Sequence, residues 1–324
     1  MSSLGAALGM APDTRKWKPS PRIADNDTFV GVEIELENLG HFGSTWSQEM
    51  CSNGLWNVTK DGSLRNHGLE FIMSAGDGQP LKGGDITRAM FRFKKVFLLY
   101  EEAGNEPPIC SPRTSVHIHI DVRDLEVQQL KKLFLLYAVF EETFFKWSDL
   151  SRYESNYCRS LEYNQDITER LSAILSMPDD SADHLTHYLV GGNKYDAMNY
   201  LSIKQRGSVE FRLMHGTTDI RLILRWINLL LCLKLAAKDD SIVIHSFPDD
   251  MSQRGLSTLI DQVFGKWGDF LKDHASELDI LRGVRKAQDI ILANEVNKLD
   301  EQFESHSSKE HSHLEAFKKI AMEA

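Results

Sequence analysis

Three short segments of the chain alternate apolar residues with acidic, imidazole or guanidinium side chains. They are VGVEIELE at 30–37, SVHIHID at 115–121 and SVEFRL at 208–213. Because alternate residues of a β-strand face the same side, each segment predicts a strand with one apolar face and one ionisable face. The ionisable side chains are Glu33, Glu35 and Glu37 in the first segment, His117, His119 and Asp121 in the second, and Glu210 and Arg212 in the third.

Two interpretations fit such a strand. The simpler one is an antiparallel sheet with one face in water, but a solvated face usually also carries Thr, Lys, Ser and Gln. The other is a binding site. Neighbouring glutamates on one strand face would repel each other, by about 4 kcal/mol for two charges about 4 Å apart at the effective dielectric of a protein surface. A bound divalent cation would offset this repulsion, and the repetition in three segments favours the site.

The side-chain types narrow the choice of cation. Carboxylates with one or two histidines favour Mg²⁺ or Mn²⁺ over Zn²⁺. The four cysteines are far apart and form no CxxC pair, which argues against a thiolate zinc site. Magnesium held by few protein groups usually also binds substrate phosphates, and Arg212 offers the planar fork that suits a phosphate. These features predict a magnesium–phosphate site and phosphoryl transfer.

The composition of the whole chain excludes several classes of partner. The formal net charge of −10 argues against nonspecific binding to nucleic acids or acidic membrane surfaces. No uncharged apolar run approaches the roughly 20 residues needed to span a bilayer. The N-terminus lacks the pattern of a secretory signal, and the cysteines do not require disulfides. We therefore expect a cytoplasmic protein.

The order of the predicted elements favours the α+β class over a regular βαβ pattern. A further strand is expected at 69–73, after a turn at Asp61-Gly62. One helix is expected at 85–100, and a second is expected to begin after a cap at Asp124. A third is expected at 217–237, where the chain is apolar nearly all round.

The chain is expected to have three parts. These are an irregular N-terminal arm at 1–27, a catalytic domain at 28–240 and a C-terminal helical segment at 241–324. The last part shows helical spacing of Leu292, Val296, Leu299 and Phe303.

Four motifs together resemble the putative amidoligase family, which is related to glutamine synthetase and the gamma-glutamylcysteine ligases. They are VGVEIELE at 30–37, KDGSLRNHGLE at 60–70, SVHIHID at 115–121 and KYDAMNYLSIKQRGSVEFRLMHGT at 194–217. They occur in the family's order. Two positions depart from its pattern: Ser115 stands where relatives often have Gly, and the sequence MSAG follows Glu70 where they often have Pro. The resemblance implies a curved, mostly antiparallel sheet like that of the glutamine synthetase catalytic domain, with helices on its apolar face.

The resemblance also implies roles for individual residues. Catalytic roles fall to Arg212 and Glu70, and His119 is placed to meet a nucleotide phosphate. Lys204 and Arg206 could bind phosphate or form a basic hairpin tip. Asn199 and Tyr195 belong to a segment that lines the site in the family. The implied metal ligands are Glu33, Glu35, Glu70, His117 and Glu210.

The implied reaction joins a carboxylate to an amine. ATP, bound with Mg²⁺ or Mn²⁺, phosphorylates the carboxylate, and attack by the amine then releases phosphate and leaves an amide. The partners would be a small-molecule or peptide carboxylate and an amine, neither of which the sequence identifies. Two alternatives remain: a metal-dependent hydrolase with the same acidic face, and a non-catalytic relative that binds a nucleotide or a partner.

Overall fold

The computed structural model describes residues 3–10, 17–76, 78–161, 165–176, 189, 193–244 and 253–291. One six-stranded sheet runs through it in the order β2-β3-β1-β4-β6-β5, and every neighbouring pair is antiparallel. This confirms the α+β class and the antiparallel sheet. The strands are β1 Val30–Leu36, β2 Trp56–Lys60, β3 Leu69–Met73, β4 Ser115–Asp121, β5 Met198–Asn199 and β6 Ser208–His215.

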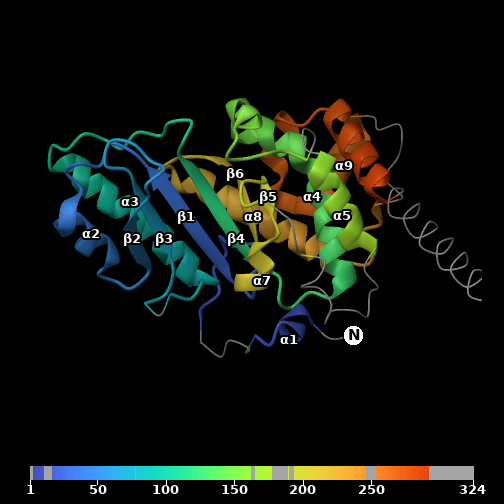
Figure 1. Ribbon diagram of the computed structural model, residues 1–324, viewed down its shortest axis with the longest axis horizontal. Helices are drawn as coiled ribbons and strands as arrows, with labels where there is room; N and C mark the ends of the chain where they lie inside the picture. The colour runs from blue at the N-terminus through green and yellow to red at the C-terminus, as the bar shows by residue number, and fades with distance from the viewer. Residues whose placement is uncertain are drawn as a thin grey trace, which may run out of the picture.

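Helices cover the apolar face of this sheet (Figure 1). Helices α3 and α8 lie behind it, and α4, α5 and α9 gather toward the β6–β5 edge. The sheet is not strongly curled, so the predicted curvature is wrong in degree; long helices that lie flat against one face favour a sheet that stays open. The helices are α1 Leu4–Ala7, α2 Gly43–Cys51, α3 Gly84–Glu102, α4 Val127–Ser148, α5 Gln165–Ser176, α7 Ser202–Arg206, α8 Ile220–Lys238 and α9 Gln253–Phe264, with 3-10 turns η1 Leu150–Glu154, η4 Gly265–Trp267 and η5 Asp269–Asp273.

The apolar face of the central strands forms the core, as the alternation predicts. Val32 and Ile34 of β1 and Val116 and Ile118 of β4 are almost fully buried. They pack in one cluster with the inward faces of α3, α4 and α8. The helices predicted at 85–100 and 217–237 are present as α3 and α8. Because the core fills one face completely, the ionisable side chains are left together on the other.

The strand register brings these ionisable side chains into direct cross-strand pairs. Glu33 lies opposite His117 on β4, and Glu35 lies opposite Glu70 on β3. Further along β4, His119 lies opposite Glu210 on β6 (its backbone partner). Directly opposed residues share a face of the sheet and bring their side chains into contact. The register therefore concentrates charge on the middle of the sheet.

A β-bulge interrupts β6 beside this cluster. Val116 pairs with Met214 but Ile118 pairs with Phe211, so β6 contains one residue more than β4 between these two pairs. The extra residue lets both Leu213 and Met214 be buried while Arg212 stays on the ionisable face. Bulges often re-aim side chains next to functional sites, and this one lies at the predicted phosphate-binding arginine.

The predicted helix cap at Asp124 is wrong. Helix α4 begins at Val127, and Glu126 caps it in a reciprocal capping box with Gln129. Asp124 instead accepts from the buried Lys234 at 2.6 Å and from Lys238 at 2.8 Å, both on α8. A buried ammonium needs a counter-charge, and this need takes precedence over the local capping preference.

The remaining differences concern short or peripheral elements. Strand β2 and helix α2 occupy the stretch between 37 and 61, which the sequence analysis leaves without predicted structure. The N-terminal arm contains the short helix α1, whose Leu4 and Gly5 amides donate to the Leu125 and Arg123 carbonyls. The helical spacing around Leu292 to Phe303 lies outside the described residues. Across the described part of the chain, no helix combines the length and apolar character needed to cross a bilayer.

Candidate active site

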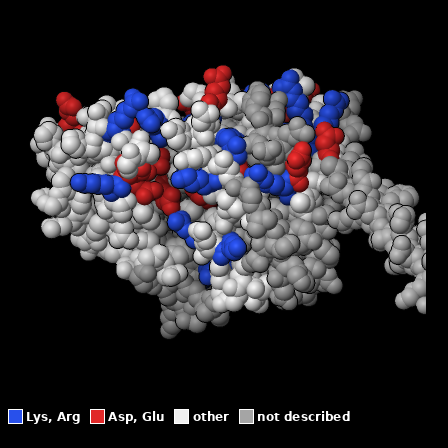
Figure 2. Space-filling view, in the orientation of Figure 1, with Lys and Arg blue, Asp and Glu red and all other residues white. Residues whose placement is uncertain are grey.

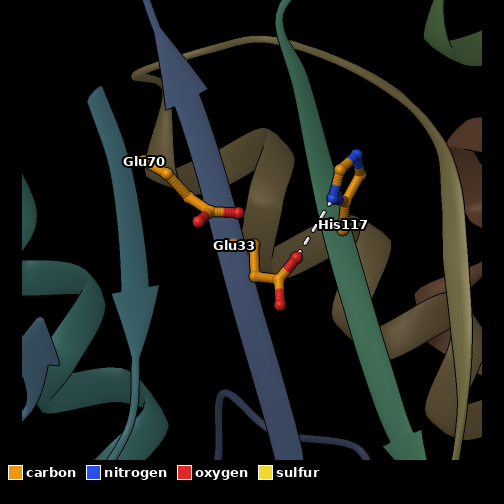
Figure 3. A group of neighbouring side chains, drawn as sticks. All are labelled: Glu33, Glu70 and His117. Atoms are coloured by element: carbon orange, nitrogen blue, oxygen red, sulfur yellow. Dashed lines mark hydrogen bonds and ion pairs between the residues drawn. The ribbon is translucent and has the colours of Figure 1, made fainter. Parts of the chain in front are cut away.

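Acidic and imidazole side chains from β1, β3, β4 and β6 converge on the open face of the sheet. Figure 3 shows Glu33, Glu70 and His117 pointing toward one another from three neighbouring strands. Three overlapping groups have ligand atoms within 4.8 Å of one another, and we call their union the acidic cluster. The groups are Glu33 with Glu70 and His117, Glu33 with His119 and Glu210, and Glu35 with Asp61 and Glu70.

His117 is the centre of this cluster. Its Nδ1 lies 3.2 Å from Glu33 Oε2 and 3.7 Å from Glu210 Oε1. Its Nε2 lies 2.6 Å from the Ser115 hydroxyl, which donates to Glu35 Oε2 at 2.6 Å. Since the hydroxyl proton goes to the carboxylate, the hydroxyl oxygen accepts from Nε2–H. This chain of hydrogen bonds leaves Nδ1, the atom that faces the carboxylates, as the nitrogen that can carry either a proton or a cation.

His119 occupies the other end of the cluster. Its Nε2 lies 3.3 Å from Glu33 Oε1, and its Nδ1 lies 3.3 Å from the Ser202 hydroxyl and 3.4 Å from the Ser208 hydroxyl. Gly31 faces this ring, and a Cβ atom there would come within 3.3 Å of the His119 Cβ. The lack of a side chain at residue 31 therefore lets the imidazole lie close to β1.

Two guanidinium groups border the cluster. Arg206 Nη1, at the end of α7, donates to Glu33 Oε1 at 3.1 Å and lies 3.3 Å from His119 Nε2. Arg212 Nη1 donates to Glu210 and lies 3.4 Å from His117 Nδ1. The Arg212 Nε is buried and has no hydrogen-bond partner among the described residues. Figure 2 shows an acidic patch over the middle of the sheet with basic side chains around it.

The cluster perturbs the ionisation of its own members. Burial raises the pKa of Glu70 to about 7, and the nearby charges of Glu33 and Glu35 add to this effect. Burial also acts to raise the pKa of Glu33, but hydrogen bonds with His117 and His119 outweigh it and hold this pKa well below its ordinary value. One carboxyl is thus held ionised by the histidines, while its neighbour resists ionisation.

Glu210 behaves like Glu33. Burial acts to raise its pKa, and the nearby charges of His119, His117 and Arg212 together lower that pKa below its ordinary value. The Asn199 side-chain amide also donates to Glu210 Oε2 at 2.7 Å. Glu210 is therefore fixed in place by groups from β4, β5 and its own strand.

The predicted site residues do not all lie at the acidic cluster. Most of them meet in the acidic cluster or touch it, including Arg206, so this arginine is no mere exposed hairpin tip. Lys204 is exposed on α7, and no described contact joins it to the cluster. Tyr195 packs edge-on against Tyr157, with ring centroids 5.5 Å apart, near the β5 edge. The residues that meet are Glu33, Glu35, Glu70, His117, His119, Asn199, Arg206, Glu210 and Arg212.

Sequence reasoning missed two participants. In the sequence, Ser115 stands out only as a departure from the family pattern, yet its hydroxyl connects Glu35 to His117. Asp61 was assigned to a turn, and it does hold one: its carboxylate accepts from the Ser63 amide at 2.7 Å. The same carboxylate also lies with Glu35 and Glu70. The position of Ser115 next to a strand of histidines was the available signal, whereas the reach of Asp61 depends on the fold of its loop.

The donor set fits a hard divalent cation. Each of the three groups contains carboxylates and at most one histidine, and no cysteine, which is the ligand chemistry that Mg²⁺ and Mn²⁺ prefer. The cluster has five carboxyl groups and only two guanidinium groups beside it, so its acidic groups outnumber the guanidinium groups by three. His117 Nδ1 and the Glu33 and Glu210 oxygens would repel one another without a proton or a cation between them.

Comparison with known proteins bears on the chemistry of this site. Residues 103–234 match the family model described as "Putative amidoligase enzyme", a family whose name implies an amide-bond-forming ligase. The matched region includes the motifs at 115–121 and 194–217, and the motifs at 30–37 and 60–70 precede it. The comparison with curated proteins gives no match. The predicted family resemblance is therefore confirmed over residues 103–234, which match the putative amidoligase enzymes.

Proposed function

We propose that this protein is an ATP-dependent carboxylate–amine ligase that forms an amide bond through an acyl phosphate. One observation carries the proposal: a partly buried cluster of carboxylates and histidines, bordered by two arginines, lies on the open face of the sheet, and three strands of that sheet belong to the matched amidoligase region. We further propose that residues 28–240 form the catalytic domain, because every group of the cluster lies within them.

Mg²⁺ is the proposed metal. Glu33, Glu70 and His117 would hold one ion, and Glu35 and Asp61 together with Glu70 would suit a second. When bound, the metal supplies positive charge that offsets the negative charge of the nucleotide phosphates. The protein's part is to hold these ligands in place, and the hydrogen bond between Ser115 and His117 orients the central imidazole.

The proposed reaction has two steps. A carboxylate oxygen of the first substrate forms a bond to the γ-phosphorus of ATP, the bond to the bridging oxygen breaks, and ADP leaves with the electron pair. The neutral amine then forms a C–N bond to the acyl carbon, the C–O bond to phosphate breaks, and phosphate leaves. One proton of the amine is released. Activation is needed because a carboxylate is a poor electrophile.

The arginines and His119 have the proposed role of holding the transferring phosphoryl group. Arg212 is the leading candidate, because its Nη1 lies beside His117 and Glu210 in the cluster and its planar fork suits a phosphate. Arg206 lies at the opposite side of Glu33 from Arg212 and is more than half exposed, so it could move onto a nucleotide. Fixed cations of this kind are worth about 10³ or more in turnover for phosphoryl transfer.

The test measures ADP formation and nucleotide binding. With Mg²⁺ and ATP, we expect ADP release only when a panel of carboxylates is supplied together with amines or with hydroxylamine, which traps an acyl phosphate as a hydroxamate. Arg212→Ala should lower turnover by about 10³ or more. Arg221→Ala, a change of the same kind at an exposed residue of α8, should have no effect. Phosphate release without ATP would instead identify a hydrolase, and equal turnover in Arg212→Ala would remove the proposed role of Arg212.

A further inference from the structure

A separate cavity lies beyond the end of β1 that carries Glu35. Its volume is about 830 Å³, within the range of small-molecule sites. Its lining is rich in amides and imidazoles: Asn38, His41, Asn66, His67, Asn105 and Glu106 contribute to it. Glu106 is the one carboxylate among the residues that line it. None of these residues belongs to the acidic cluster.

The backbone around this cavity is unusual. Among the described residues, the non-glycine positions with positive φ are Asn38 at 62°, Asn66 at 49° and His67 at 57°, and all three line the cavity. This region is uncommon for residues other than glycine, and asparagine and histidine are among those that adopt it most often. Such conformations persist where the surrounding structure enforces them, and they cluster at ligand sites. All three lie in the walls of this one cavity, so its shape depends on these turns.

The cavity and the acidic cluster share their structural supports. The loop that follows β2 starts at Asp61, in the acidic cluster, and reaches the cavity at Asn66 and His67. Glu37 joins the two regions, because it is buried and accepts from the Arg65 amide at 2.8 Å. Asn38 follows the end of β1 and lies three residues after Glu35, a separation of at most about 10 Å in extended backbone. A single extended substrate could therefore occupy both places.

The lining selects the chemistry of the ligand. The amide and imidazole side chains can donate or accept hydrogen bonds, so they do not select a charge. The exposed Glu106 carboxylate, which accepts from the Asn38 amide at 3.2 Å, supplies the negative charge of the lining. No lysine or arginine is among the lining residues. Building on the proposed function, we infer that this cavity binds the non-reacting, cationic end of the amine substrate. The substrate would then be a polyamine-like molecule with an ammonium group about 10 Å from the amine that reacts.

The test uses spermidine, a linear triamine, as the probe, and the form acetylated on both terminal amines as the ligand control. Binding is measured by calorimetry with Mg²⁺ and ADP in excess, so that the acidic cluster does not compete for the amine. Glu106→Gln keeps the size of the side chain and removes its charge. Glu102→Gln removes the same charge from an exposed residue at the end of α3, outside the cavity, and serves as the matched control.

We expect spermidine to bind the wild type and Glu102→Gln equally, and to bind Glu106→Gln at least tenfold more weakly. The acetylated form should bind all three proteins weakly. Equal binding of spermidine to Glu106→Gln and the wild type, or the absence of binding to the wild type, would overturn the inference. Binding of Mg²⁺ with ADP is measured on the same proteins without amine and should be equal in all three. Its absence would count against the proposed function alone, because the contrast between Glu106→Gln and Glu102→Gln still reports on the cavity.

Discussion

Replacement of Glu70 by Gln removes the least favourable negative charge in the acidic cluster. Glu70 lies opposite Glu35 in the sheet, and its ligand oxygen is close to those of Glu33, His117 and Asp61 in two of the three groups. Gln has nearly the same shape and keeps an oxygen that can accept from the Thr59 hydroxyl, as Glu70 does at 3.2 Å. The substitution therefore removes the charge with little change in packing.

The expected effect on stability follows from the pKa of Glu70, which rises from 4.5 to about 7 on folding. Between these values the folded state binds a proton that the unfolded state has lost. The free energy of unfolding of the wild type therefore falls as the pH rises from about 4.5 to about 7. At about 1.4 kcal/mol for each pKa unit, a rise of this size would amount to about 3 kcal/mol for a fully buried group. Glu70 is partly exposed, and solvent screening reduces the figure to roughly 1–2 kcal/mol.

Thermal unfolding at two pH values measures this effect. Without metal at pH 8, Glu70→Gln should be more stable than the wild type, and at pH 4.5 the two proteins should be nearly equal. Glu101→Gln, at an exposed position on α3, removes the same formal charge and should not reproduce the pattern. Mg²⁺ with ATP at a hundredfold excess over Kd should stabilise the wild type by roughly 2.7 kcal/mol, and much of this gain should be lost in Glu70→Gln.

Two results would refute this reasoning. If Glu70→Gln were destabilising at pH 8, the Glu70 carboxylate would be a stabilising member of a hydrogen-bond network and not a site of stored repulsion. If the variant kept the full ligand-induced stabilisation, Glu70 would not hold the metal. The first result would not decide whether Glu70 binds the metal, whereas the second would remove Glu70 from the proposed ligands.

Three further predictions test other parts of the structure. Ser115→Ala should weaken Mg²⁺ binding by roughly 10–100-fold, measured by calorimetry, because the His117 ring loses its orienting partner; unchanged affinity would assign the hydroxyl to structure alone. Asp124→Asn should lower the free energy of unfolding in urea by roughly 1–3 kcal/mol, because Lys234 would lose its counter-charge; a capping role would predict almost no change, since Asn caps as well as Asp. Ile118→Ala should cost about 2–5 kcal/mol in the same assay, and a loss below 1 kcal/mol would contradict its place in the core.

The sequence predicts the central strands well because their two faces differ so sharply in chemistry. In β1 and β4, every second residue is apolar and buried, and the intervening side chains are ionisable except at Gly31 and Ser115. The edge strand β2 lacks this contrast, since only Trp56 of its five residues is fully buried. Strand β5 has two residues, too few to produce a periodic signal. A strand can thus be predicted from a single sequence when one of its faces is buried and the other is not.

The site residues divide along similar lines. Glu33, His117 and Glu210 could be predicted because each lies on a strand whose facing is fixed by its apolar neighbours. Arg206 could not be placed with confidence from spacing, because its reach depends on the turn at Gly207, whose left-handed φ of 67° ends α7. Asp61 likewise depends on a loop. Periodicity does not predict the position of a side chain that is set by the conformation of a turn or a loop.

The geometry of the acidic cluster is maintained by the apolar side of the same strands. A shift of β4 by one residue against β1 would turn His117 and His119 into the core and expose Val116 and Ile118. Exposure of Val116, Ile118 and Ile120, at about 1.5–3 kcal/mol each, would cost more than the repulsion within one close pair of carboxylates, which is roughly 4 kcal/mol. The core therefore fixes the register, and the register keeps like charges together that would otherwise separate. A site that binds a cation can be held ready in this way before the cation arrives, because the free energy that assembles it comes from the opposite face of the sheet.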